Sequence, residues 1–233
     1  MSTDAQGAAA VDAIPFEERW SFAPAQAQGQ PHRCEFLAFN TFARISAYGP
    51  QAQVEPALLA ARAACRRYER LFSKTLPHSE VARLNSAGGA RVQLSEDSFA
   101  LLEGSVGFCR ASQGCFDITL GPVLALWDFK RGTMPSREAI SAALEHVGWQ
   151  QLELGGEPGQ RWARLPDPQA SIDLGGTAKG YIADRLCEQL TAAGLGSFVV
   201  NLGGNVAVRG GRPDGRPFSI GIRNPRAPGE NLA

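Results

Sequence analysis

After about residue 35, most of the chain shows either alternating or helically spaced hydrophobic positions. Residues 36–48 alternate well enough to predict a strand, which Gly49-Pro50 ends. Residues 54–72 predict a helix, because apolar side chains recur there at close to helical spacing, at Val54, Leu58, Cys65, Tyr68 and Phe72. Serine is a favoured N-cap, and further helices are predicted where a serine precedes an apolar periodic stretch, at Ser79, Ser95 and Ser136.

The second half of the sequence predicts short strands around one more helix. The strands are expected at 150–154, 161–165, 172–174 and 198–202. Thr177 is the predicted N-cap of the helix, whose apolar residues are spaced four apart at Ile182, Leu186 and Leu190. A Pro-Asp-Gly triplet predicts a hairpin between 206–209 and 218–222. Without a regular βαβ repeat, these elements predict an α+β fold with mixed sheets and flanking helices.

Composition and charge narrow the class of protein. Hydrophobic residues make up 44% of the chain and charged residues 20%, which is typical of a globular protein. The formal net charge is zero, which argues against a nucleic-acid surface or a polybasic membrane patch. No segment has the roughly 18 consecutive apolar residues that a membrane span requires. We therefore expect neither a nucleic-acid partner nor a membrane span.

The first 33 residues differ from the rest of the chain. They are rich in Ala, Gln, Gly and Pro, and they predict a flexible N-terminal extension before one domain at 34–233. They also lack a basic start followed by an apolar stretch, so no signal peptide is predicted and a cytoplasmic location is expected.

The cysteines and histidines show no pattern of a metal or disulfide site. Five scattered cysteines without a Cys-x-x-Cys pair argue against zinc and against a disulfide framework. The histidines are isolated in the sequence, which favours surface or packing roles over metal ligation, at His32, His78 and His146.

Residues 171–186 are the most informative stretch. An apolar run ends at Asp173, two glycines follow, and Lys179 lies where the next helix begins. Glycines let a ligand approach the backbone, and free N–H groups at a helix N-terminus attract anions such as phosphates. The spacing fits neither a P-loop nor a dinucleotide-binding fingerprint. A plain turn followed by a capped helix remains open as an alternative.

Four segments together resemble one known family. Asp-Leu-Gly-Gly-Thr-Ala-Lys-Gly-Tyr at 173–181 resembles the signature of ApbE-type FAD:protein FMN transferases. The segment 116–129 resembles that family's Asp-x-Thr-x-Gly-Pro motif with its later Leu-Trp pair. Ser73, Ser79-Glu80 and Leu84-Asn85 resemble its early serine and asparagine motif, and Asn-Leu-Gly-Gly at 201–204 resembles its strand end. The order and approximate spacing agree over residues 36–226.

The resemblance implies a fold and an activity. The fold would be a flavin transferase domain (ApbE-like and T-fold-related) with FAD in a central cleft. Its members cleave FAD at the pyrophosphate, transfer FMN to a Ser or Thr hydroxyl of a target protein and release AMP, with Mg²⁺ required. The implied partner is a flavin-accepting subunit of a redox pump or reductase, and the resemblance allows a periplasmic location.

The resemblance also implies roles for residues. Asp173 would contact the flavin nucleotide, Lys179 would lie near its phosphates, and the Gly176 carbonyl would bind Mg²⁺, a cation that prefers oxygen ligands. Further FAD contacts would come from positions that match the family's binding segments, at Phe39, Thr75, Phe116, Asp117 and Thr119. Asp173 and Asp117 could instead stabilise turns.

The sequence departs from the family at its end. The family continues beyond residues 221–226 with a His-x-x-Asp-Pro-x-Thr-Gly motif and with an Asp and a Thr that complete the magnesium site, whereas this sequence ends at Ala233. We therefore expect a C-terminally truncated transferase domain, with no catalytic residue assigned. The alternatives are a catalytically incomplete FAD-binding protein and a structural or interaction domain that retains only the fold.

Overall fold

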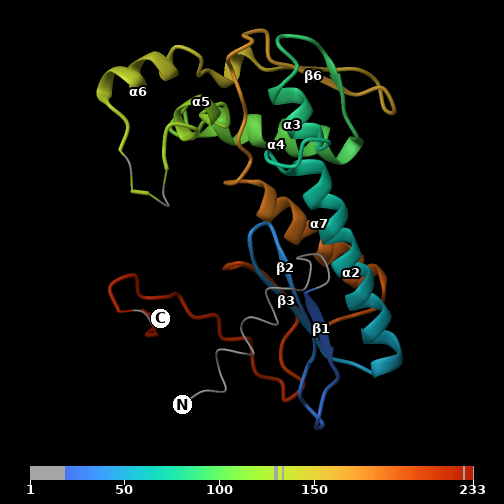
Figure 1. Ribbon diagram of the computed structural model, residues 1–233. Coiled ribbons are helices and arrows are strands. Elements are labelled where there is room, and N and C mark those ends of the chain that lie inside the picture. The colour runs from blue at the N-terminus through green and yellow to red at the C-terminus, as the bar shows by residue number, and fades with distance from the viewer. Residues whose placement is uncertain (1–18, 129–130, 133, 228, 233) are drawn as a thin grey trace. The chain divides into compact units, whose positions relative to one another are not determined.

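The computed structural model describes residues 19–128, 131–132, 134–227 and 229–232 (Figure 1). The chain divides into two compact units, the first formed by residues 1–63 with 183–233 and the second by residues 64–182. The boundaries fall inside helices α2 (Gln51–Phe72) and α7 (Ala178–Ala192). Helices and antiparallel sheets are both present, which confirms the predicted α+β class.

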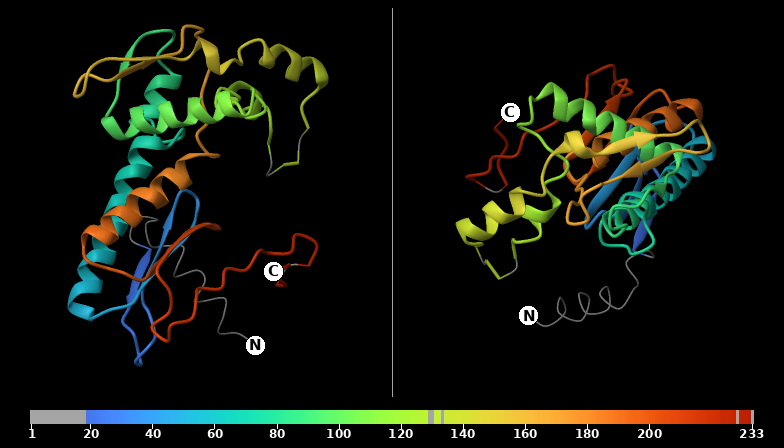
Figure 2. Two further views of the ribbon diagram at one scale, coloured as in Figure 1. Left: turned by 180° about the vertical axis from the view of Figure 1, so that it is seen from behind. Right: turned by 90° about the horizontal axis from the view of Figure 1, so that it is seen from above.

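The first unit is built on a five-stranded antiparallel sheet in the order β1-β2-β3-β7-β8. Its strands are β1 (Trp20–Ala23), β2 (His32–Ala38), β3 (Thr41–Ala47), β7 (Phe198–Leu202) and β8 (Asn205–Arg209). Alternate residues of the three central strands are almost completely buried, among them Phe36, Ile45 and Phe198. The first half of α2 and the second half of α7 lie beside this sheet (Figures 1 and 2).

The single strand expected at 36–48 is wrong, because the chain forms a hairpin there. Strands β2 and β3 pair through Ala38 and Thr41, which leaves Phe39 and Asn40 as a two-residue turn with φ of 54° at both. Such a turn requires positive φ at both central residues, and glycine or asparagine usually provides it. The buried positions change from even to odd numbers across the turn, from Phe36 and Ala38 to Ala43 and Ile45. Asn40 suits the turn, but the apolar residues on both sides of it make the two strands look like one.

The hairpin expected between 206–209 and 218–222 is also wrong. Strand β8 pairs with β7 through Gly203 and Gly204, at φ of 63° and 97°, and residues 218–222 lie outside the strands. Strand β8 is instead the edge of the sheet, and the two glycines before it supply the left-handed conformations that its tight hairpin with β7 needs.

Strand β1 lies inside the segment expected to be a flexible extension. It pairs with β2 in antiparallel register from Trp20 opposite Phe36 to Ala23 opposite Arg33. Residues 1–18 of that segment lie outside the described residues.

The second unit contains short helices and a small antiparallel sheet. The sheet has the order β4-β6-β5, formed by β4 (Val92–Gln93), β6 (Trp162–Arg164) and β5 (Glu153–Gly155). The helices are α3 (Glu80–Asn85), α4 (Glu96–Ala111), α5 (Gly121–Leu124), α6 (Arg137–Leu144) and the 3₁₀ helix η2 (Trp149–Gln151). Its core includes Leu102, Cys109, Ile118 and Ile172. None of the helices in the described ranges is long and apolar enough to cross a membrane.

All three serine N-caps are confirmed. The hydroxyl of Ser79 accepts a hydrogen bond from Ala82 N (2.9 Å), that of Ser95 from Ser98 N (3.3 Å) and that of Ser136 from Ala139 N (3.1 Å). Each hydroxyl satisfies one of the N–H groups that a helix leaves without an internal acceptor.

Candidate functional site

The segment before the Gly-Gly turn is extended but is not the strand expected at 172–174. Only Ser171 forms an isolated parallel bridge, with Leu120. Gly121 N donates to Ser171 O (3.2 Å), and Asp173 N donates to Ile118 O (2.8 Å). Residues 171–173 are therefore held against the 118–121 segment by single bonds rather than by a regular ladder.

Asn85 holds the same segment from another side. Its side chain accepts from Ile172 N (2.8 Å) and donates to Ile172 O (3.0 Å). An asparagine amide can both accept and donate in this way, as a neighbouring strand would. The pair of bonds explains why a buried apolar residue such as Ile172 needs no strand partner.

Asp173 is the centre of the site. Its Oδ1 accepts from Gly175 N (2.7 Å), and its Oδ2 accepts from Lys74 Nζ (2.6 Å). Burial alone would raise the pKa of Asp173, but the Lys74 and Gly175 hydrogen bonds and the charges of Lys74 and Lys179 outweigh it and lower that pKa. The carboxylate is therefore ionised at neutral pH, with positive charge around it.

Helix α7 begins directly after this turn, and its N-terminus lacks the expected cap. The Thr177 hydroxyl donates weakly to Leu174 O (3.5 Å) and accepts from Ser105 Oγ (2.9 Å). Among the described residues, no N–H group of the first helical turn donates to it. Ala178 N donates to Leu174 O (2.8 Å), and the next bond of helical spacing runs from Tyr181 N to Thr177 O (3.1 Å). The N–H groups of Lys179 and Gly180 precede that bond, and the described residues offer them no acceptor.

Phe116 and Gly176 are in close contact. A Cβ added at Gly176 would lie 2.9 Å from Cε2 of the Phe116 ring. The Phe116 backbone is fixed by its N–H, which donates to Ser112 Oγ (3.0 Å). Glycine at 176 thus gives the aromatic ring room against the turn.

Gly176→Ala is expected to destabilise the chain by about 1 kcal/mol, at the low end of the usual overpacking cost, because a ring edge can shift. Thermal denaturation measures the change. The double variant Phe116→Ala/Gly176→Ala is the control: the alanine at 176 should then cost nothing further, and additive losses would show that the clash is elsewhere.

Asp117 and Thr119 are engaged with the protein itself. Asp117 Oδ1 accepts from Thr119 N (2.8 Å) and from the Thr119 hydroxyl (2.6 Å), and Oδ2 accepts from Trp149 N (3.2 Å). Thr119 Oγ1 in turn accepts from Gly148 N (2.8 Å). In this structure both side chains stabilise the turn that presents Phe116 and join it to the start of η2.

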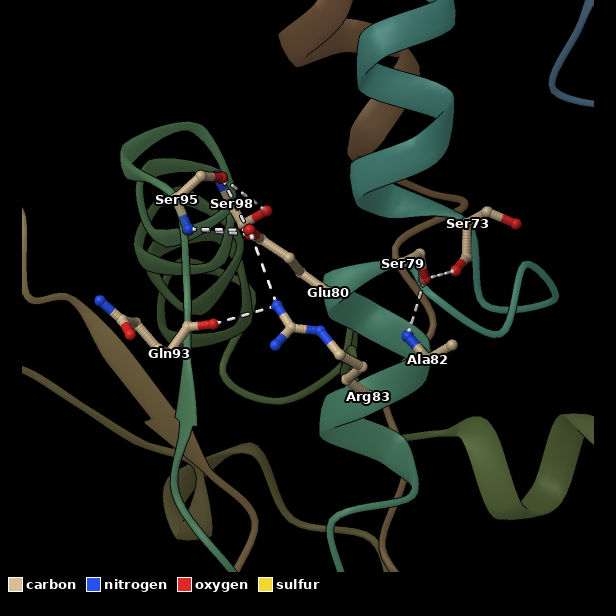
Figure 3. A network of polar contacts seen from close by, with 8 residues as sticks. All are labelled: Ser73, Ser79, Glu80, Ala82, Arg83, Gln93, Ser95 and Ser98. Carbon is tan, nitrogen blue, oxygen red and sulfur yellow. Dashed lines mark hydrogen bonds and ion pairs between the residues drawn. The ribbon is translucent and has the colours of Figure 1, made fainter.

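Thr75 lies in the bend between α2 and α3, in a loop that serine side chains fix. Ser73 Oγ accepts from Thr75 N (3.2 Å) and Leu76 N (3.1 Å), and the Ser79 hydroxyl donates to Ser73 O. Figure 3 shows how the Ser79 contact ties this loop to the first turn of α3. In the same view Glu80 accepts from Ser95 N (2.9 Å), which links the N-termini of α3 and α4.

Phe39 is the one predicted site residue that lies in the first unit. It occupies the β2–β3 turn at φ of 54°, a conformation that strains a bulky side chain by about 1–3 kcal/mol. Strain of this kind motivates a functional hypothesis for the residue. Next to this turn, Gly203 N donates to Phe42 O (3.1 Å).

Phe39→Asn tests that hypothesis. Asparagine suits a turn with positive φ, so the variant is expected to keep the melting temperature or raise it by a few degrees. If Phe39 serves a ligand, flavin affinity falls at the same time, as measured by quenching of flavin fluorescence. A fall in melting temperature with unchanged affinity would instead assign the ring a structural role.

The second unit holds the other seven predicted residues, which are Asp173 and six residues linked to it. A hydrogen bond from Asp173 N to Ile118 O links Asp173 to the segment that contains Phe116, Asp117 and Thr119. The ion pair with Lys74 links it to the loop of Thr75, and Gly176 and Lys179 follow it along the chain. Lys74 and the role of Asn85 could not be predicted from the sequence. Asn85 lies in the Leu84-Asn85 motif, which does not say what its side chain binds, and a lysine in a polar loop carries no local signal of function.

The protein donors around this turn are too few to hold a magnesium ion by themselves. No group of three or more His, Cys, Asp or Glu side chains that could hold a metal ion occurs among the residues that the structure describes. Both Asp173 oxygens already accept hydrogen bonds. Mg²⁺ often relies on one or two protein ligands with water and substrate phosphates, so Gly176 alone would be a partial site.

A sequence model of the ApbE family matches residues 39–233. The chain belongs to the ApbE family. A Treponema pallidum protein named FAD:protein FMN transferase is 32% identical over 215 residues. The alignment covers 84% of this chain and 59% of that relative. A Klebsiella pneumoniae protein of the same name is 29% identical over 192 residues, or 80% of this chain and 55% of the relative.

Solved ApbE structures confirm the flavin transferase fold. The ApbE protein of Thermotoga maritima superposes with a TM-score of 0.78 at 27% identity, over 87% of this chain and 66% of that one. The Pseudomonas stutzeri flavinyl transferase ApbE, in its apo form, gives a TM-score of 0.73 at 26% identity, over 85% of this chain and 64% of that one. The chain thus spans somewhat more than half the length of its first relatives.

Proposed function

We propose that this chain binds FAD and acts in the transfer of FMN to a Ser or Thr hydroxyl of a target protein, with release of AMP. The observation that carries the proposal is the match to the ApbE family over residues 39–233, with relatives named FAD:protein FMN transferase. The proposed partner is a flavin-accepting protein, such as a subunit of a redox pump or reductase.

The residues around Asp173 fit part of this chemistry. Cleavage of a pyrophosphate depends mainly on positioning and on neutralising charge. Lys179 and the uncapped first turn of α7 would face the phosphates, and the glycines would let them approach the backbone. Asp173 would accept a hydrogen bond from the flavin nucleotide, and Phe116 would contact its apolar part. Thr75 and Phe39 are proposed as further contacts.

Magnesium dependence belongs to the proposal as well. Bound Mg²⁺ would neutralise charge on the phosphates, and the Gly176 carbonyl is the protein oxygen proposed to face it.

A second candidate is an FAD-binding protein without transferase activity. The observation that favours it is local: among the described residues no group of three or more His, Cys, Asp or Glu side chains could hold a metal ion, and both Asp173 oxygens already accept hydrogen bonds.

One experiment separates the two candidates. The chain is incubated with FAD, Mg²⁺ and a flavin-accepting protein, and FAD binding, AMP release and covalent labelling are measured together. AMP release with labelling supports transfer. Binding without AMP release supports the second candidate, and the absence of FAD binding contradicts both.

A further inference from the structure

Lys74 forms an ion pair across the candidate site. It lies in the bend after α2, and its Nζ is 2.6 Å from Asp173 Oδ2, a residue 99 positions later in the chain. We propose that Lys74 is a specificity-determining residue that binds the phosphate groups of the flavin nucleotide and thereby favours FAD over riboflavin. This inference rests on the proposed function, because it assumes that a flavin nucleotide binds at Asp173.

Asp173 does not need Lys74 to keep its position. Its other carboxylate oxygen accepts from Gly175 N (2.7 Å), and its own N–H donates to Ile118 O (2.8 Å). The Lys74 side chain is 51% exposed, so water already solvates its ammonium group, whereas the Asp173 side chain is 18% exposed. The ammonium group can therefore turn from the carboxylate to a ligand, and Asp173 keeps its bond from Gly175 N when it does.

The backbone around Lys74 is held in place. Ser73 Oγ accepts from the N–H groups of Thr75 and Leu76, and Ser79 donates to Ser73 O. Figure 3 shows the anchoring of Ser73 by Ser79. Because the loop is fixed on both sides of Lys74, only the side chain has to reorient, which keeps the entropy lost on binding small.

The local charges favour a polyanion. Lys74 and Lys179 both act electrostatically on Asp173, so two positive charges accompany one negative charge at this turn. A lysine ammonium is a compact charge that suits phosphate oxygens. Riboflavin carries no phosphate and gains nothing from such a charge, whereas the FAD pyrophosphate does. Lys74 would therefore contribute to discrimination rather than to general flavin affinity.

The test compares dissociation constants for FAD and riboflavin, measured by fluorescence quenching at low and high salt. Lys74→Met is expected to weaken FAD binding about tenfold, the loss of about 1.4 kcal/mol of interaction, and to change riboflavin binding less than about twofold. FAD affinity should also become less sensitive to salt, because a charge contact is lost. Lys74→Arg keeps the charge and should retain most of the affinity. Arg216→Met is the matched control, since it removes one charge from an exposed pair with Asp214 in the first unit, whereas Lys74 and Asp173 belong to the second.

Three results would overturn the inference about Lys74. They are equal losses for FAD and riboflavin, unchanged FAD affinity in Lys74→Met, and an equal loss in the Arg216→Met control. If the unsubstituted chain binds no FAD at all, the proposed function itself fails. If the unsubstituted chain binds FAD and Lys74→Met binds it equally well, only the role of Lys74 is rejected.

Discussion

Asp173→Asn is expected to raise the dissociation constant for FAD about 10- to 100-fold, the effect of losing one hydrogen bond to a charged group. The asparagine can still accept from Gly175 N, so the turn keeps its shape. It cannot balance the charge of Lys74, and a neutral amide accepts a ligand hydrogen bond less strongly than a carboxylate. Titration of flavin fluorescence measures the affinity.

The same variant has a pH signature in stability. The pKa of Asp173 is lowered in the folded chain, so the unfolded state takes up its proton at higher pH than the folded state. The carboxylate therefore stabilises the fold above its unfolded pKa of about 3.9, and this contribution is lost as the pH falls through the lower folded value. The stability difference between the unsubstituted chain and Asp173→Asn should be full at pH 7 and shrink below about pH 4.

Asp214→Asn is the control for the affinity measurement. Asp214 is also an ionised carboxylate with a lowered pKa, about 2, held by hydrogen bonds from Arg216. It is not among the predicted site residues, so its substitution should leave FAD affinity unchanged. A folded Asp173→Asn variant that binds FAD as tightly as the unsubstituted chain would favour a structural or interaction domain instead.

Features that depend on neighbouring residues could be predicted from the sequence. The caps at Ser79, Ser95 and Ser136 are local, because each hydroxyl needs only an N–H three residues later. The two-residue hairpin at Phe39 and Asn40 was missed, although the buried positions change from even to odd numbers across it, because apolar residues continue on both sides of Asn40.

Features that depend on residues far apart in the chain could not be predicted from the sequence. The apolar run at 172–174 reads as a strand, yet an asparagine side chain and the 118–121 segment supply its partners. Thr177 has the chemistry of an N-cap, but Ser105, 72 residues earlier, engages its hydroxyl. The motifs identified the residues of the candidate site, whereas their convergence on Asp173 and the part of Lys74 required the fold.

Gly121→Ala is expected to have the largest effect on stability, about 3 kcal/mol, at the upper end of the usual overpacking cost. An added Cβ would lie 2.5 Å from Ser171 O and 2.8 Å from Ser171 C. These are backbone atoms, which cannot rotate away as a side chain would. The same close approach allows Gly121 N to donate to Ser171 O (3.2 Å). Ser171 lies two residues before Asp173.

Thermal denaturation should therefore show a fall in melting temperature of about 6–12 °C for Gly121→Ala, given the usual scaling for a chain of this size. FAD affinity should fall with it even well below the melting temperature, because the clash pushes residues 171–173 away from the 118–121 segment. Gly107→Ala in α4 is the control, and it is expected to raise the melting temperature. Nothing lies within 4 Å of its added Cβ, and alanine favours a helix over glycine by up to about 1 kcal/mol. Equal melting temperatures for the two variants would contradict the close packing of Gly121 against Ser171.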